Sequence, residues 1–383
     1  MYNNPVGGQA SSVGSQLRTD YYVKKALIDL VKEQYFTQLA DTTTMPKHHG
    51  KHLKQYVYVP LLDDRNTNDQ GINAQGKVIE NGNLYGSSKD IGTIVGKLPL
   101  LQENSKRVNR VGFTRQTIEG TFAKYGIFME YTQDSLDFDT DSELMSHMHR
   151  EIMRGANEIT EDTLQIDLIN NARTICYPGN ATDNATIGED TVVTYKMLLD
   201  LSRILDNNRT PKHTTAITGS RMIDTRTIPN GRVMYVGSEL RYTLQSMRDI
   251  FDNPAFIPVE KYAAGGTVLT GEIGTVGNFR IVEVPEMTHW AGVGKAASAG
   301  THYETEGKAD VFPMLVVGDK SFTTIAFKTD GKSNKFIVKH KKPGEITPSD
   351  PYGQVGIMSL QWYYGFMALR PERIALIKTA ALR

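Results

Sequence analysis

The sequence predicts an α+β fold, and three observations support this prediction. A helical pattern of roughly 30 residues follows Thr140, against a usual helix length of about 11–12 residues. Between residues 177 and 342, segments with strand character alternate with two helical segments. Residues 63–92 are rich in Asn, Asp, Gly and Ser, which favours an extended loop or hairpin over a packed core.

The N-terminal third is predicted to contain an arm, a helix and several strands. Residues 1–18 have few apolar anchors and are expected to be a flexible arm. The apolar spacing predicts a helix from about Asp20 to Leu39, and Gln55–Pro60 alternates like a strand. Further strands are expected at 91–95, 108–113 and 125–131.

The long helix has a defined start in the sequence. Thr140 and Glu143 form a capping-box pattern, in which each side chain satisfies a backbone amide of the first turn. The apolar face continues to about Ala172, which predicts a rod of roughly 45 Å. Its pattern is too irregular for a coiled coil, so we expect this helix to lie against a sheet.

The region after the long helix has an α/β pattern. Helices are predicted at Tyr195–Asp206 and near Ser238–Phe251. Strands are predicted at Thr214–Thr218, Val233–Val236, Phe279–Val284, Met314–Val317, Phe322–Phe327, Lys335–Lys339, Ile357–Tyr364 and Ile374–Ile377.

Composition excludes several classes of protein. The 383 residues include 43 Lys and Arg and 43 Asp and Glu, so the net charge is zero, which argues against a protein that coats nucleic acid. The single cysteine, Cys176, excludes a disulfide framework. We expect cytosolic synthesis and no membrane association, because neither a secretion signal nor a run of 18 apolar residues is present. A neutral chain also lacks the self-repulsion that keeps copies apart.

No chemical motif is complete, so we predict a protein that is not an enzyme, with no catalytic residue, cofactor or metal. Gly331-Lys332-Ser333 ends like a phosphate-binding loop, but Ala326 stands where the first glycine is required, and a hairpin turn is favoured. His48, His49 and His52 lie among lysines that would repel a cation.

Charge is segregated along the chain. Residues 133–190 hold 13 acidic and three basic residues, whereas residues 97–115 hold five basic and one acidic. Residues 328–342 hold six lysines and one aspartate. Such blocks favour complementary contacts between copies of the chain, which guide register more than they supply affinity.

Six segments in combination resemble the major capsid proteins of tailed bacteriophages, most closely the capsid family of short-tailed phages like phage N-four. They are KQYVYVPL (54–61), RVGFTR (110–115), EITEDTLQIDLI (158–169), TGSRMIDTRTIP (218–229), GEIG with FRIVEVPEM (271–287) and DPYGQVG (350–356). The resemblance covers essentially the whole chain and implies a Hong Kong 97-type fold.

That resemblance also implies a domain order. Residues 1–46 would be the N-terminal arm and helix, and 47–128 an extended hairpin, the E-loop, with flanking strands. Residues 129–177 would form a P domain around the spine helix, and 178–345 an α/β A domain. Residues 346–383 would supply strands that return to the P domain.

The implied function is a virion shell. Copies would self-assemble in the bacterial cytoplasm into hexamers and pentamers of an icosahedral head around double-stranded DNA, contacted without sequence preference. Scaffolding, portal and decoration proteins would be further partners. An encapsulin-type cellular compartment protein is one alternative, and a tail-associated glycan-binding or hydrolytic protein is another.

The charge blocks predict where neighbouring copies touch. A two-stranded hairpin is marginal in water, so the E-loop needs a surface to lie on. We expect its basic residues to lie near the acidic spine helix of the adjacent copy. The candidates are Lys97, Lys106, Arg107, Arg110 and Arg115 on the E-loop, and Glu143, Glu151, Glu158, Glu161 and Asp162 on the helix.

Overall fold

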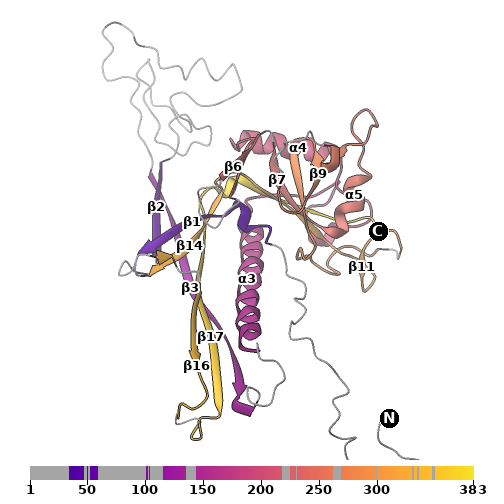
Figure 1. Cartoon of the computed structure of the whole chain (residues 1–383). Coiled ribbons are helices and arrows are strands. Elements are labelled where there is room, and N and C mark those ends of the chain that lie inside the picture. The colour runs from indigo at the N-terminus through magenta and orange to yellow at the C-terminus, as the bar shows by residue number, and fades with distance from the viewer. Residues whose placement is uncertain are drawn as a thin grey trace, which may run out of the picture. The chain divides into compact units, whose positions relative to one another are not determined.

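The structure is a computed structural model with two compact units (Figure 1). The residues it describes are 34–46, 50, 52–58, 101, 103, 115–134, 144–217, 225–229, 231–261, 269–297, 300–329, 332–333, 336–346 and 350–383. The hairpin unit contains Tyr125–Asp162 and Phe336–Trp362. The sheet unit takes its residues from Tyr35–Lys124, Thr163–Lys335 and Tyr363–Arg383.

A seven-stranded mixed sheet forms the centre of the sheet unit. Its order is β4 (Thr174–Cys176), β18 (Ile374–Thr379), β13 (Phe312–Val317), β7 (Arg232–Gly237), β10 (Phe279–Val284), β9 (Glu272–Val276) and β8 (Phe256–Pro258). The β4–β18 and β7–β10 pairs are parallel and the other neighbours antiparallel. β18 therefore lies inside this sheet, between β4 and β13.

Continuous apolar runs explain why this sheet is the main core. All residues of β7 and β13 are buried, as expected of strands covered on both faces. Two helices, α4 (Tyr195–Asn207) and α5 (Arg241–Gln245), contribute leucines to one face. α4 begins at Thr194, whose side chain accepts a hydrogen bond from the amide of Met197.

A second sheet also has seven strands. Its path is β1 (Asp41–Pro46), β14 (Phe322–Thr329), β17 (Val355–Ala368), β3 (Arg115–Thr132) and β2 (His52–Tyr58). β15 (Lys332–Ser333) pairs with β14, and β16 (Phe336–Lys341) pairs with β17. The antiparallel pairing of β15 with β14 fits the hairpin turn predicted for this segment, and Gly331 itself lies outside the described residues.

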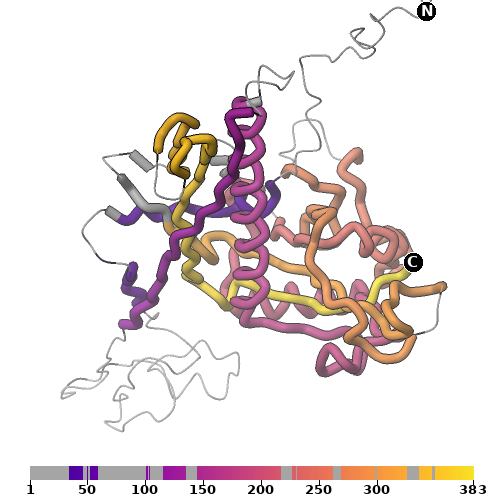
Figure 2. Tube along the Cα trace, turned by 90° about the horizontal axis from the view of Figure 1, so that it is seen from below, coloured from indigo at the N-terminus to yellow at the C-terminus, as the bar shows by residue number. Residues whose placement is uncertain are grey.

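The long helix, α3, spans Leu144–Asn170 without a break (Figure 2). Its 27 residues give a length of about 40 Å, close to the prediction. Ile152, Ala156, Leu164 and Leu168 form its buried stripe. The predicted cap at Thr140 and Glu143 lies outside the described residues. No helix among the described residues is long and apolar enough to cross a membrane.

Several elements are short and local. β5 (Thr214–Ile217) pairs with β6 (Thr225–Ile228), and β11 (Glu304–Thr305) pairs with β12 (Lys308–Ala309). Single 3₁₀ turns are η2 (Thr37–Leu39), η4 (Asn184–Thr186), η5 (Ser238–Leu240), η6 (Val259–Lys261) and η7 (Pro371–Arg373).

Two predicted helices differ from the structure. The one expected up to Leu39 is described only from residue 34, and there it is a single 3₁₀ turn followed by β1. The one expected near Ser238–Phe251 ends at Gln245, because a turn held by the Asp249 carboxylate replaces its last part.

Candidate inter-subunit contact sites

Of the five basic candidates, only Arg115 lies among the described residues. Lys97, Lys106, Arg107 and Arg110 lie outside them. Arg115 begins β3, and its guanidinium carbon lies 4.2 Å from the centroid of the Tyr56 ring on β2. Both side chains remain exposed, so this cation–π contact orients the guanidinium at the surface.

The β2–β3 pair also carries an exposed ion pair. Lys54 Nζ lies 2.6 Å from the Glu119 carboxylate, directly across the two strands. This hydrogen bond raises the pKa of Lys54 and lowers the pKa of Glu119. Since each charge already has a partner of opposite sign, Arg115 is the better candidate for a contact with another copy.

The acidic candidates on α3 differ in how far their side chains are exposed. Glu158 accepts a hydrogen bond from Arg154 Nε at 3.1 Å, and Glu151 lies 3.5 Å from the same guanidinium. Glu151 keeps 59% of its side chain exposed, and Asp162 is also exposed. Glu161 is only 8% exposed in the single chain, and its contact with a neighbour stays a prediction. Glu143 lies outside the described residues.

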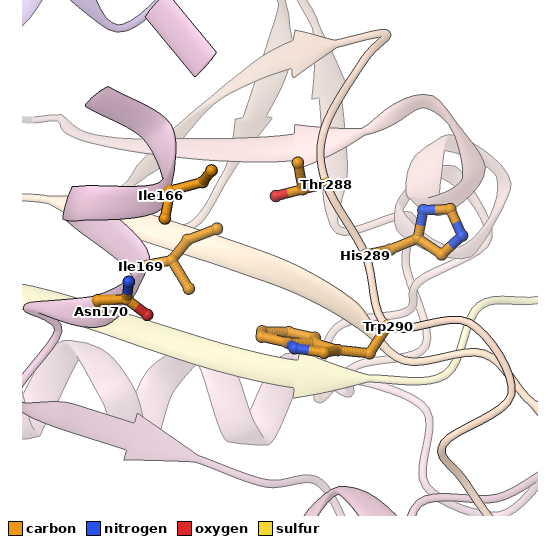
Figure 3. Close-up of a pocket in the computed structure, with 6 residues that line it drawn as sticks. All are labelled: Ile166, Ile169, Asn170, Thr288, His289 and Trp290. Atoms are coloured by element: carbon orange, nitrogen blue, oxygen red, sulfur yellow. The ribbon is translucent and has the colours of Figure 1, made fainter. Parts of the chain in front are cut away.

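A small pocket in the sheet unit was not predicted (Figure 3). It measures about 150 Å³ and lies between the last turn of α3 and the segment after β10. Ile166 and Ile169 project from the helix toward Thr288 and Trp290, whereas the His289 ring turns away and stacks on Phe312 at 5.0 Å. Asn170 completes the lining.

Trp290 is in contact with a partly buried cation. Lys378 Nζ, on β18, lies 4.5 Å from the Trp290 ring centroid and 5.9 Å from that of Tyr177. Burial lowers the pKa of Lys378, as expected for an ammonium group placed against aromatic faces. This contact fixes the indole that lines the pocket.

The loop between β16 and β17 is clamped by one carboxylate. Asp350 accepts hydrogen bonds from the amides of Val355 at 2.9 Å and Gln354 at 3.1 Å, and Lys341 Nζ lies 3.8 Å away. The hydrogen bond from Val355 is the largest cause that lowers the pKa of Asp350. Tyr352 on this loop is 86% exposed, so the clamp holds a large side chain at the surface.

The described residues do not assemble a metal site. Among them, no three His, Cys, Asp or Glu side chains form a group that could hold a metal ion. Burial raises the pKa of the Cys176 thiol, which disfavours the reactive thiolate.

The comparisons with known proteins point to one family. Residues 115–379 match the family model described as phage capsid protein. The chain is 57% identical to the major capsid protein of Pseudomonas phage KPP21, over 99% of this chain and 97% of that protein. This chain belongs to the phage capsid protein family. Its members are structural proteins, so the prediction of a non-enzymatic major capsid protein of the virion is confirmed.

Solved phage capsid structures confirm the fold. The capsid protein of Ralstonia phage GP4 aligns with a TM-score of 0.58 at 10% identity, covering 98% of each chain. That of cyanophage Pam1 aligns with a TM-score of 0.55 at 12% identity, covering 97% of this chain and 98% of the other. The Hong Kong 97-type α+β fold is thus confirmed, and the encapsulin and tail-protein alternatives receive no support.

Proposed function

We propose that this capsid protein assembles with copies of itself into hexamers and pentamers of an icosahedral head that encloses double-stranded DNA. The 57% identity to a phage major capsid protein over nearly the full length carries this proposal. The zero net charge supports it physically, because copies near their isoelectric point repel each other weakly.

We further propose that residues 47–128 act as an E-loop that lies on the spine helix of the adjacent copy. Arg115 stands exposed at the base of this segment, and Glu151 and Asp162 are exposed on α3. Attraction between these groups would select register and partner orientation, with most of the affinity coming from buried apolar surface. Many equivalent contacts in a ring make weak individual pairs sufficient.

The finer assignments are also proposals. The six sequence segments support a place in the capsid family of short-tailed phages like phage N-four. Assembly is proposed to occur in the bacterial cytoplasm, with scaffolding, portal and decoration proteins as further partners. Contacts with DNA would use scattered Lys and Arg on phosphates, so they should weaken with salt and ignore sequence.

Electron microscopy of the purified chain tests the assembly step. We expect closed shells with hexameric and pentameric clusters, and nuclease-resistant DNA inside them when the phage portal and terminase are co-expressed. A chain that stays monomeric at high concentration, with native secondary structure, would contradict the proposal. Shells that never protect DNA in the presence of both partners would contradict the genome-enclosing role alone.

A further inference from the structure

Three loops of the sheet unit meet at one surface, the basic patch. They are residues 207–213 after α4, 318–321 after β13 and 370–373 before β18. Asn208 Nδ2 donates a hydrogen bond to the Glu372 carbonyl at 3.0 Å. Arg373 Nη1 donates to the Asp319 carbonyl at 2.8 Å, and the Gly318 amide donates to the Arg373 carbonyl at 3.0 Å. These hydrogen bonds fix the positions of the three loops relative to one another.

The basic patch exposes cations and withdraws its anions. Its basic side chains are Arg209, Lys212, Lys320, Arg370 and Arg373, and its acidic ones are Asp319 and Glu372. The Asp319 side chain is 7% exposed and that of Glu372 17%, whereas Lys212 is 55% exposed. Asp206, the partner of Lys212 at 3.3 Å, also accepts a hydrogen bond from the buried Arg232. The potential at the surface of the patch is therefore positive.

This excess of positive charge is only partly balanced within the chain. Burial lowers the pKa of Arg373, and the positive charge of Arg370 lowers it further. Lys320 is exposed and has no carboxylate within 4 Å among the described residues. An anion from outside the chain would relieve the repulsion between these cations.

Two of the cations are held on strained backbone. Arg209 has a φ of 56° and Lys320 a φ of 49°, both in the left-handed region. Arg209 follows the C-cap of α4, a place where glycine is preferred, although the helix dipole stabilises an arginine there. Lys320 follows a strand and gains nothing from a helix dipole. Strain of this kind persists mainly where a side chain has a function.

We propose that the basic patch binds the phosphate backbone of double-stranded DNA. The inference rests on the proposed enclosure of DNA and gathers part of that contact at one site. The three loops expose no large apolar side chain, whereas the buried core of an interface between proteins is apolar. Phosphate contacts need only cations and hydrogen-bond donors, and they carry no sequence information.

The other basic side chains of the hairpin unit fit this role less well. Lys341 on β16 lies 3.8 Å from the Asp350 carboxylate. Lys339 is exposed on the same strand, which pairs only with β17 among the described strands, and a lysine on an edge strand prevents pairing with a further strand. Arg154 on α3 is already paired with Glu151 and Glu158.

The salt dependence of DNA binding tests the patch. Fluorescence anisotropy of a labelled duplex measures the affinity of the unassembled, full-length chain between about 50 and 200 mM salt. We expect Arg209→Gln/Lys320→Gln to reduce the slope of log affinity against log salt by about two, because each lost phosphate contact removes about one. Duplexes of different sequence should give the same slope.

The matched control is Lys295→Gln/Lys308→Gln. These two lysines are exposed in the same unit but lie outside the three loops, so the change in net charge is identical. The control should keep the wild-type slope. Equal slopes for the patch variant and the control would overturn the proposal, and so would an absence of DNA binding by the wild-type chain at about 50 mM salt.

Lys320→Gly separates a binding role from a folding role. Glycine adopts a left-handed φ without strain, so this variant should unfold at no lower urea concentration than the wild type. Its slope for DNA should nevertheless fall by about one. A variant that unfolds at lower urea concentration and keeps the wild-type slope would make Lys320 a structural residue and overturn its place in the patch.

Failure of the patch and failure of the proposed function give different results. If Arg209→Gln/Lys320→Gln binds DNA like the wild type but forms no shells, the patch is a contact between copies and the proposal is overturned. Wild-type shells that never protect DNA from nuclease in the presence of portal and terminase would contradict the proposed enclosure, whatever the slopes are. Protected DNA together with unchanged slopes would overturn the patch alone.

Discussion

Arg232 is fully buried at the start of β7, and its guanidinium donates a hydrogen bond to the Asp206 carboxylate at the end of α4. The same group also donates to the Thr210 carbonyl at 2.7 Å and the Ser202 hydroxyl at 3.2 Å. The Arg232 side chain thus joins α4 to the central sheet. It also provides a hydrogen-bond donor for the Thr210 carbonyl, which follows α4.

We expect Arg232→Met to lower the free energy of unfolding by about 3 kcal/mol, because it leaves several buried acceptors without a donor. Urea unfolding of the unassembled chain measures the change. The matched control is Arg241→Met, which removes a pair between an exposed arginine and Glu283 at 3.4 Å. That loss should be at most about 1 kcal/mol. Equal effects of the two substitutions would contradict the role assigned to Arg232.

Acid should release the clamp at Asp350. The pKa of this carboxyl is lowered in the folded chain, first by the hydrogen bond from Val355, from an ordinary value of 3.8. Its contribution to stability is therefore complete above pH 3.8 and is lost as the pH falls through the lower folded pKa. Asp350→Asn should be less stable than wild type at neutral pH, and the two unfolding curves should converge in strong acid.

The control for Asp350 is Asp200→Asn, on the exposed surface of α4 beside Arg203. Its stability should differ from wild type by at most about 0.5 kcal/mol at neutral pH. Parallel curves for Asp350→Asn and wild type down to the lowest pH would refute the clamp as an acid-sensitive element.

Charge reversal tests the proposed contact of the E-loop with the spine helix. We expect the double variant Arg107→Glu/Arg110→Glu to form few or no shells, because like charges would face the acidic helix. Adding Glu151→Lys and Asp162→Lys should restore part of the yield. Lys196→Glu/Arg203→Glu, an exposed pair of sites on α4, controls for the change in net charge. If electron microscopy shows a normal number of shells for Arg107→Glu/Arg110→Glu, the proposed contact is contradicted.

Long or continuous apolar patterns were predictable from sequence, and short strands were not. Phe279–Val284 matches β10 at both ends, because five of its six residues are buried and its Phe, Ile and Val residues give a clear strand pattern. Phe256–Pro258 and Thr174–Cys176 are three-residue strands, too short to show a period, and they form through pairing with β9 and β18.

The candidate contact residues were predictable from the sequence, whereas the pocket was not. The exposed charges of Arg115, Glu151 and Asp162 follow from local charge blocks. The pocket joins residues 166–170 to residues 288–290, which no local pattern connects. The turn at Asp249 was predicted as helix, because the apolar spacing continues there and only the structure shows the carboxylate accepting two backbone amides.

Two glycines in the hairpin unit should respond in opposite ways to alanine. At Gly356 on β17, an added Cβ would overlap the ring of Tyr131, which is only 7% exposed and whose hydroxyl is hydrogen-bonded to His340. At Gly155 in α3, an added Cβ would meet no atom of the described residues within 4 Å. Gly356→Ala should therefore cost about 1–3 kcal/mol of unfolding free energy, as overpacking does. Gly155→Ala should add about 0.5–1 kcal/mol, since alanine replaces glycine inside a helix.

Thermal unfolding of both variants and of Gly356→Ala/Tyr131→Leu separates steric overlap from other causes. If the overlap with the Tyr131 ring is the cause, the smaller leucine side chain accommodates the new methyl group, so the double variant should lose less stability than the two single changes predict. Additive losses would place the cost of Gly356→Ala in the β17 backbone. A destabilised Gly155→Ala would mean that this face of α3 is already covered by another part of the chain.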